Sequence, residues 1–156
     1  MFREMRRKLQ ALDQAECKRI LREGKTGVLA LSGDGGYPYP VPLNYVYDGE
    51  YIYFHCAKTG HKIDSVNRCD KAGFCVVDKD EVMPEKFATA YKSVIAFGRI
   101  SLVKEEEEMR RATYLLSKKY SPEESDENIN REIAAFFPAL AVMKMKIEHV
   151  TGKRNK

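Results

Sequence analysis

Runs in which apolar and polar residues alternate recur along the chain, and this period of two is typical of strands in a half-buried sheet. Residues 48 and 49, Asp-Gly, form a turn signal between two such runs and predict a hairpin. Residues 79–89 are polar and are expected to be a link. The expected strands cover residues 28–32, 37–47, 51–56, 72–78, 91–103 and 139–150. The pattern therefore predicts a sheet of about six mostly antiparallel strands.

Helical periodicity appears between these strands. Asp13 with Glu16 three residues later is typical of a capping box at a helix start. Glutamates at 105–108 and lysines at 118–119 complement the two ends of a longer helix. The expected helices cover residues 13–24, 60–68, 105–119 and 126–136, with Thr59 as the N-cap of the second. The expected fold class is α+β, mainly β, with helices flanking the sheet.

Composition is typical of one domain. The chain has 156 residues, 44% of them hydrophobic, enough for a single core and too few for a second sizeable one. We therefore expect one domain over residues 1–156. No apolar run approaches a membrane span, and the first eight residues are charged without the apolar segment of a signal peptide. These features predict a cytoplasmic protein without a membrane partner.

Cysteine and charge patterns exclude several classes of function. Cys17, Cys56, Cys69 and Cys75 include no CxxC pair, and the three histidines are widely spread, so we expect reduced thiols and no metal site. The net charge is +4, with basic clusters mainly at the two ends of the chain. Aromatic residues lie in the strand-like runs and not between exposed basic residues, so no nucleic-acid partner is expected.

The most informative segment is the end of the strand at 51–56 and the turn that follows it. His55, Cys56 and Ala57 lead through Lys58, Thr59 and Gly60 into the helix that begins at His61 and Lys62. Glycine allows close approach of the backbone, and a helix start offers unpaired N–H groups and the positive end of the dipole. The segment predicts a phosphate site. A surface turn with solvated lysines is the alternative interpretation.

Proline occupies every second position at 38, 40 and 42, within the expected strand 37–47. The three missing N–H groups would all face one side of the strand, so that side cannot form an ordinary ladder. One interpretation is a sheet edge or a gap in a barrel. The other is backbone left free around residues 41–44 to meet a flat polar ligand, and the two are compatible.

Spacing alone does not decide between a phosphorylated cofactor and a phosphorylated substrate. A thiol hydrolase built on His55 and Cys56 is disfavoured, because neighbouring residues on a strand point to opposite faces. His149 lies in a basic terminal strand, where a structural role is expected.

Two longer runs carry a family resemblance. Residues 36–45, GYPYPVPLNY, and residues 53–62, YFHCAKTGHK, resemble the flavin-binding split β-barrel family, in the branch related to pyridoxamine 5'-phosphate oxidase that includes nitroimidazole-resistance proteins. Residues 91–94 with Gly98, and residues 151–153, resemble the same branch, so the similarity covers nearly the whole chain. The second long run is fairly specific because its His, Ala, Gly and Lys follow a strand and open a helix.

The resemblance implies a six-stranded antiparallel split β-barrel that binds FMN at the subunit interface of a homodimer. The phosphate would lie on the turn at 60–62, and the ring against the strand at 41–44. Tyr91 and Ser93, which share a strand face, could complete the phosphate or ring contacts, or form a cross-strand packing pair instead. The implied cofactor-binding residues are Val41, Pro42, Leu43, Asn44, His55, Cys56, Ala57, Gly60, His61, Lys62, Tyr91 and Ser93.

The same resemblance places His55 near the flavin ring as the catalytic residue, where it would orient a substrate or deliver a proton. The expected function is FMN-dependent reduction of nitroimidazole-like or other small electron-accepting compounds. A general flavin reductase and a non-catalytic flavin-binding or redox-sensing module are the alternatives. The sequence lacks the arginine-rich constellation that pyridoxamine phosphate oxidation would need. No dinucleotide fingerprint identifies the electron donor, which could be a diffusing molecule or a partner protein.

Overall fold

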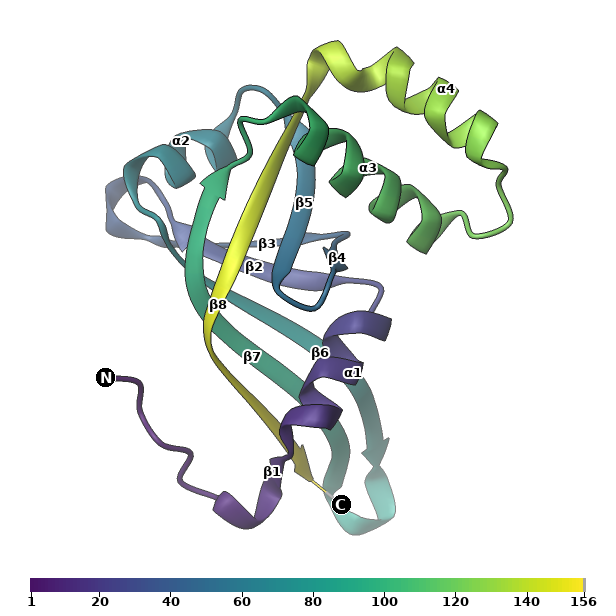
Figure 1. Ribbon diagram of the computed structural model, residues 1–156. Coiled ribbons are helices and arrows are strands. Elements are labelled where there is room, and N and C mark those ends of the chain that lie inside the picture. The colour runs from purple at the N-terminus through teal and green to yellow at the C-terminus, as the bar shows by residue number, and fades with distance from the viewer. Residues whose placement is uncertain (156) are drawn as a thin grey trace.

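The computed structural model describes residues 1–155, and these form an α+β fold that is mainly β (Figure 1). Within this range, eight strands form one antiparallel sheet that does not close, and four α-helices accompany it. The strands are β1 (Ala11–Leu12), β2 (Gly27–Ser32), β3 (Pro38–Leu43), β4 (Val46–Tyr47), β5 (Tyr51–Ala57), β6 (Lys71–Met83), β7 (Ala88–Leu102) and β8 (Leu140–Asn155). The α-helices are α1 (Gln14–Glu23), α2 (His61–Arg68), α3 (Glu106–Tyr120) and α4 (Asp126–Phe136).

The strand count of the expected six-stranded barrel is wrong. The sheet runs in the order β3-β2-β6-β7-β8-β5-β4, with β1 added beside β8. One extra strand is the two-residue β1, and the other arises because the expected strand at 37–47 is two strands. β3 pairs with β2 and β4 pairs with β5, so the two halves lie at opposite ends of the sheet order.

The break between β3 and β4 is caused by two side chains at the end of α3. The backbone N–H of Tyr45 donates a 3.0 Å hydrogen bond to the hydroxyl of Tyr120 at the end of α3, and Lys119 donates to the Tyr45 carbonyl, also at 3.0 Å. Side chains of α3 thus take the backbone groups of Tyr45 that a ladder would otherwise use. The Tyr45 side chain itself is fully buried.

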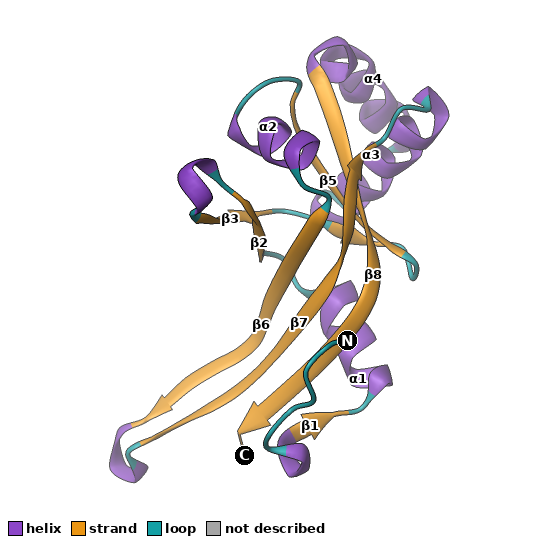
Figure 2. Cartoon of the chain, turned by 90° about the vertical axis from the view of Figure 1, so that its left-hand side faces the viewer, coloured by secondary structure: helices purple, strands orange, loops and turns teal. Residues whose placement is uncertain are grey.

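The expected polar link at 79–89 is also wrong in its first and last parts. β6 continues to Met83 and β7 begins at Ala88, so the two form a long antiparallel hairpin that extends away from α2, α3 and α4 (Figure 2). A register irregularity lies between Val77 and Lys79, and the pairing continues beyond it to Met83 and Ala88. The sequence pattern did not predict this extension, because its residues are mostly polar and neither of its faces is buried.

Helix positions largely agree with the sequence pattern, apart from one cap. Asp13 caps α1 by accepting a 2.7 Å hydrogen bond from the N–H of Glu16. The predicted cap Thr59 is wrong, because α2 begins one residue later with Gly60 at its N-cap. Gly60 has a φ of 123°, a backbone conformation that residues with a side chain rarely adopt.

Two apolar clusters position the site, one on each side of β5. Phe54 belongs to the main core with Phe74 and Ile100, whereas Tyr53 belongs to a second cluster beneath α3. The hydroxyl of Tyr53 donates to Glu108 of α3 at 2.9 Å, which fixes the helix over the strand. None of the helices in residues 1–155 combines the length and apolar character of a membrane span.

Candidate functional site

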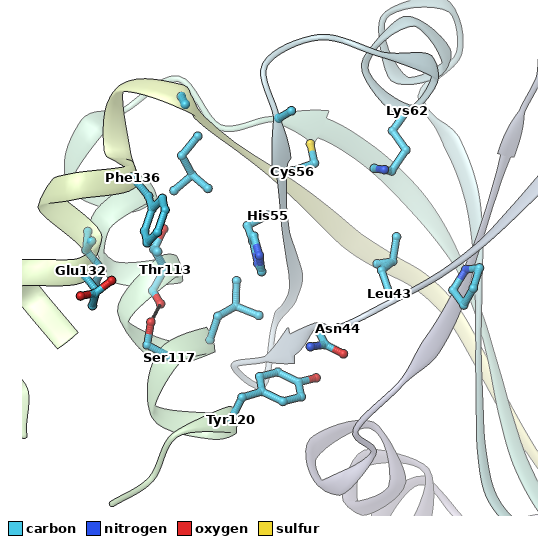
Figure 3. Close-up of a pocket in the computed structure, with 16 residues that line it drawn as sticks. Leu43, Asn44, His55, Cys56, Lys62, Thr113, Ser117, Tyr120, Glu132 and Phe136 are labelled. Carbon is cyan, nitrogen blue, oxygen red and sulfur yellow. Dashed lines mark hydrogen bonds between the residues drawn. The ribbon is translucent and has the colours of Figure 1, made fainter. Parts of the chain in front are cut away.

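A cavity of about 690 Å³ lies where the ends of β3 and β5 approach the start of α2, and α3 and α4 form its other wall (Figure 3). Its volume is within the usual range for a cofactor or small-molecule site. Seven of the twelve residues predicted to bind a cofactor line it: Pro42, Leu43, Asn44, His55, Cys56, Ala57 and Lys62. The structure therefore brings together the two sequence runs that carried the resemblance.

The strand β3 supplies one wall of the cavity from a sheet edge. It stands last in the strand order and pairs only with β2 among the described strands. Proline cannot donate to a ladder, so the N–H groups that bond β2 must belong to the alternate residues Tyr39, Val41 and Leu43. The carbonyls of the three prolines then face the free edge. The edge interpretation of the prolines is confirmed, and that edge offers hydrogen-bond acceptors.

His55 stands near the middle of the cavity, on β5, with its ring directed into the space (Figure 3). Its side chain remains exposed, and within residues 1–155 no protein hydrogen bond restrains the imidazole. The surrounding protein atoms lower the pKa of His55 below its ordinary value, because they replace water that would solvate the charged form. The ring is therefore neutral at neutral pH and free to bond a ligand.

Cys56 and Lys62 lie toward the α2 end of the same cavity. Burial raises the pKa of the Cys56 thiol, and the nearby charge of Lys62 opposes this effect only in part. The side chain is thus a neutral thiol at neutral pH. This protonation state agrees with the expectation that Cys56 is not a hydrolase nucleophile.

The α2 end of the cavity is positively polarised. No side chain caps the first turn of α2, so its leading N–H groups lack a partner of that kind. A side chain at Gly60 would meet no atom within 4 Å, so the backbone at the turn is open to solvent. Lys62, one residue into the helix, adds a full positive charge beside this turn.

The side chain of His61 lies outside the cavity. Its ring stacks on Tyr39 of β3 with 3.9 Å between ring centroids and 11° between planes. Its Nε2 lies 3.8 Å from Oδ2 of Asp34, and Arg68 donates a 2.7 Å hydrogen bond to Oδ1 of the same carboxylate. His61 therefore links α2 to β3 and to the loop that precedes β3, and does not line the cavity.

The other predicted residues lie outside the cavity of this chain. Val41 packs against the main core, and Gly60 forms the adjacent turn. Tyr91 and Ser93 lie on β7, where they pair with Asn155 and Lys153 of β8. The structure does not bring these two to the cavity of this chain, and each also faces a neighbour on β6, Asp80 and Val77 respectively.

Sequence reasoning missed the wall formed by α3 and α4. The cavity residues from these helices, from the turn that follows α4 and from the start of β8 are Thr113, Leu116, Ser117, Tyr120, Glu132, Ile133, Phe136, Ala139 and Leu140. The amphipathic pattern predicted the helices but not what their faces would meet. Thr113 and Ser117, spaced by four beside a buried apolar stripe, were the available signal for a polar wall.

A model of the family described as pyridoxamine 5'-phosphate oxidase matches residues 13–154. The chain belongs to this family. Among proteins of curated function, none matches the chain.

Solved structures share the fold of this pyridoxamine 5'-phosphate oxidase family member. A conserved hypothetical protein from Mycobacterium tuberculosis has a TM-score of 0.82 at 20% identity, over 97% of this chain and 90% of its own. A candidate 5-nitroimidazole antibiotic resistance protein from Bacteroides thetaiotaomicron VPI-5482 has a TM-score of 0.74 at 19% identity, over 92% and 86%. An FAD-binding protein from Mesorhizobium loti has a TM-score of 0.63 at 22% identity, over 94% and 98%.

Proposed function

We propose that the chain is an FMN-dependent reductase of nitroimidazole-like or other small electron-accepting compounds. The single observation that carries the proposal is the cavity, in which residues 42–44 of the predicted ring-binding strand and Lys62 of the predicted phosphate turn lie around His55. Membership of the family, together with structural neighbours that include an FAD-binding protein and a candidate nitroimidazole resistance protein, supports a flavin at this place.

The residues present fit the chemistry of FMN. Its phosphate needs cationic and N–H donors, and these are Lys62 and the uncapped start of α2. Its ring needs apolar contacts and a few polar ones, which Leu43 and Ala57 on one hand and Asn44 on the other can supply. The proline carbonyls on the free edge of β3 add acceptors for a ring N–H.

In this proposal the electron transfer from a donor to the acceptor would be supplied by FMN bound in the cavity. The chain itself binds both molecules and handles one proton. His55 can donate an N–H hydrogen bond to the acceptor while neutral, and can deliver a proton from its ring when charged. Its lowered pKa makes the first role dominant at neutral pH. The buried apolar side chains Leu116 and Ile133 in the wall from α3 and α4 limit access of water to the same space.

A homodimer is part of the proposal. The exposed apolar residues Val28, Val77, Ile95 and Phe97 lie on the neighbouring strands β2, β6 and β7. The register joins Val28 to Cys75 and Cys75 to Ile95, so these side chains share one face of the sheet. A second copy that covered this face would remove the apolar patch from water.

This dimer model also gives a role to Tyr91 and Ser93, two of the five predicted residues that do not line the cavity. Tyr91 and Ser93 stand at two-residue spacing from Ile95 and Phe97 on β7, and therefore point to the same face. We propose that they contact the flavin of the partner across the interface.

Spectroscopy and turnover test the proposal. The purified protein should be yellow or should bind FMN in a titration, with riboflavin and FAD as comparison ligands. The loaded protein should then oxidise a reduced nicotinamide in the presence of a nitroaromatic acceptor. A protein that binds no flavin would contradict the proposal. Flavin binding without turnover, with several donors and acceptors, would instead favour a flavin-binding or redox-sensing module.

A further inference from the structure

The wall of the cavity that α3 and α4 form differs in charge from the wall beside α2. Lys62 supplies the positive charge at the α2 end, whereas Glu132 of α4 supplies a negative charge on the opposite side (Figure 3). Within residues 1–155 no ion pair or hydrogen bond engages the Glu132 carboxylate. An unpaired carboxylate at the mouth of a cavity is available to a ligand.

The hydroxyl groups of this wall can offer a ligand only hydrogen-bond acceptors, because their protons are already donated to backbone carbonyls. Thr113 donates its proton to the carbonyl of Met109 at 2.7 Å, and Ser117 donates to the carbonyl of Thr113 at 2.9 Å. Each hydroxyl has one proton, so only lone pairs remain for the cavity. Tyr120 likewise directs its hydroxyl to backbone groups, including the carbonyl of Lys25 at 2.6 Å.

Apolar side chains complete this part of the cavity. Leu116, Ile133 and Phe136 line it together with the acceptor groups just described. Phe136 is 64% exposed, so its ring offers a flat apolar surface that nothing else in the described chain covers fully. The combination suits a flat apolar molecule that carries hydrogen-bond donors.

We propose that the space beneath α3 and α4 binds the electron acceptor, and that Glu132 selects acceptors bearing a positive charge or an N–H donor over anionic ones. The proposal rests on the reductase function proposed above and specifies its substrate class. A carboxylate or phosphate on the acceptor would face Glu132 and two hydroxyl oxygens without an available proton, whereas an ammonium group would be bonded by them.

Two nitroaromatics of similar shape and opposite charge test this selection. 4-Nitrobenzylamine carries an ammonium group and 4-nitrobenzoate a carboxylate, and the ratio of their kcat/KM values measures the preference. The wild-type protein should prefer the amine. Glu132→Gln should lower that ratio by about two- to fivefold, the scale of one exposed ion pair. Glu132→Lys should reverse the preference.

Glu127→Gln is the matched control. Glu127 lies on the same helix, is exposed and does not line the cavity, so the change alters net charge equally without altering the wall. The ratio for Glu127→Gln should equal that of the wild type. An equal fall in both variants would show a general field effect and would overturn the assignment to Glu132. An unchanged ratio in Glu132→Gln would overturn it too.

Binding of the non-reducible ligands benzylamine and benzoate separates this inference from the reductase function. Calorimetric titration of flavin-loaded and flavin-free protein should show tighter binding of benzylamine, and Glu132→Gln should weaken it. If flavin binds and the amine preference is present without turnover, the reductase function fails and the selectivity stands. If turnover occurs with no preference between the two charges, the selectivity fails alone. Melting temperatures confirm that each variant is folded.

Discussion

Replacing Lys62 by alanine gives the sharpest test of where a flavin phosphate would bind. Lys62 is half-buried, lies in the cavity beside the start of α2, and is close enough to Cys56 to influence the pKa of that thiol. Within residues 1–155 it forms no salt bridge with a carboxylate. Its removal therefore deletes no ion pair from the folded chain, and the melting temperature without ligand should change little.

The expected loss of affinity follows from this position. A charged hydrogen bond to phosphate contributes about 1.5 to 3 kcal/mol, which corresponds to a rise in the FMN dissociation constant of about 10- to 150-fold. Partial solvent exposure and the remaining N–H groups of α2 favour the lower half of that range. Fluorescence quenching on titration with FMN measures the constant directly.

Riboflavin makes the measurement specific, because it has the same ring without the phosphate. Lys62→Ala should leave riboflavin affinity nearly unchanged, so the effect should appear only in the difference between the two ligands. Lys58→Ala is the control, since Lys58 is exposed in the preceding turn and does not line the cavity. An equal loss for riboflavin and FMN, or an unchanged FMN constant, would refute the phosphate assignment.

Three further predictions concern other parts of the molecule. His55→Ala should bind FMN nearly normally and lower acceptor turnover by about a hundredfold, measured on one preparation; an unaltered rate would reject its catalytic role. Ile95→Lys should convert the proposed dimer into a monomer by light scattering, since the exposed Ile95 side chain lies in the apolar face. Burial lowers the pKa of Lys119 to about 8 from 10.5. Between these values the unfolded chain holds a proton that the folded chain has released, so urea stability should rise with pH there, and Lys119→Met should lose this rise.

The strand and helix pattern could be predicted where it depended on local chemistry. The Asp13 cap, the Asp48 turn and the extent of α4 each follow from residues within a few positions of one another. Asp48, for example, accepts hydrogen bonds from the N–H groups of Glu50 and Tyr51. Such features can be predicted from the sequence because they depend on no tertiary contact.

Errors arose where distant residues decided the outcome. The expected strand at 37–47 is interrupted at Tyr45 by side chains from positions 119 and 120, more than seventy residues away. The hairpin extension of β6 and β7 pairs two segments whose exposed faces lack the alternation that marks a half-buried strand. Neither effect has a local signature.

The same distinction between local and distant determinants applies to the candidate site. The wall from β3, β5 and α2 was predictable because a turn, a helix start and a strand end lie within one short stretch, and a family resemblance covered it. His61 shows the limit of that reasoning, since its neighbour Lys62 lines the cavity while its own ring stacks on Tyr39. Adjacent helical residues point about 100° apart, so a basic pair at a helix start rarely serves one ligand with both members.

The break at Tyr45 connects the fold to the site. Lys119 and Tyr120 occupy the backbone groups of Tyr45, and this both ends β3 at the cavity and fixes the last turn of α3 beside it. If β3 and β4 had formed one continuous strand, the pairing of β4 with β5 could have extended along β3 and covered the edge beside Leu43 and Asn44. The hydrogen bonds that interrupt the sheet are therefore the ones that leave a wall of the cavity open and bring the acceptor-lined helix over it.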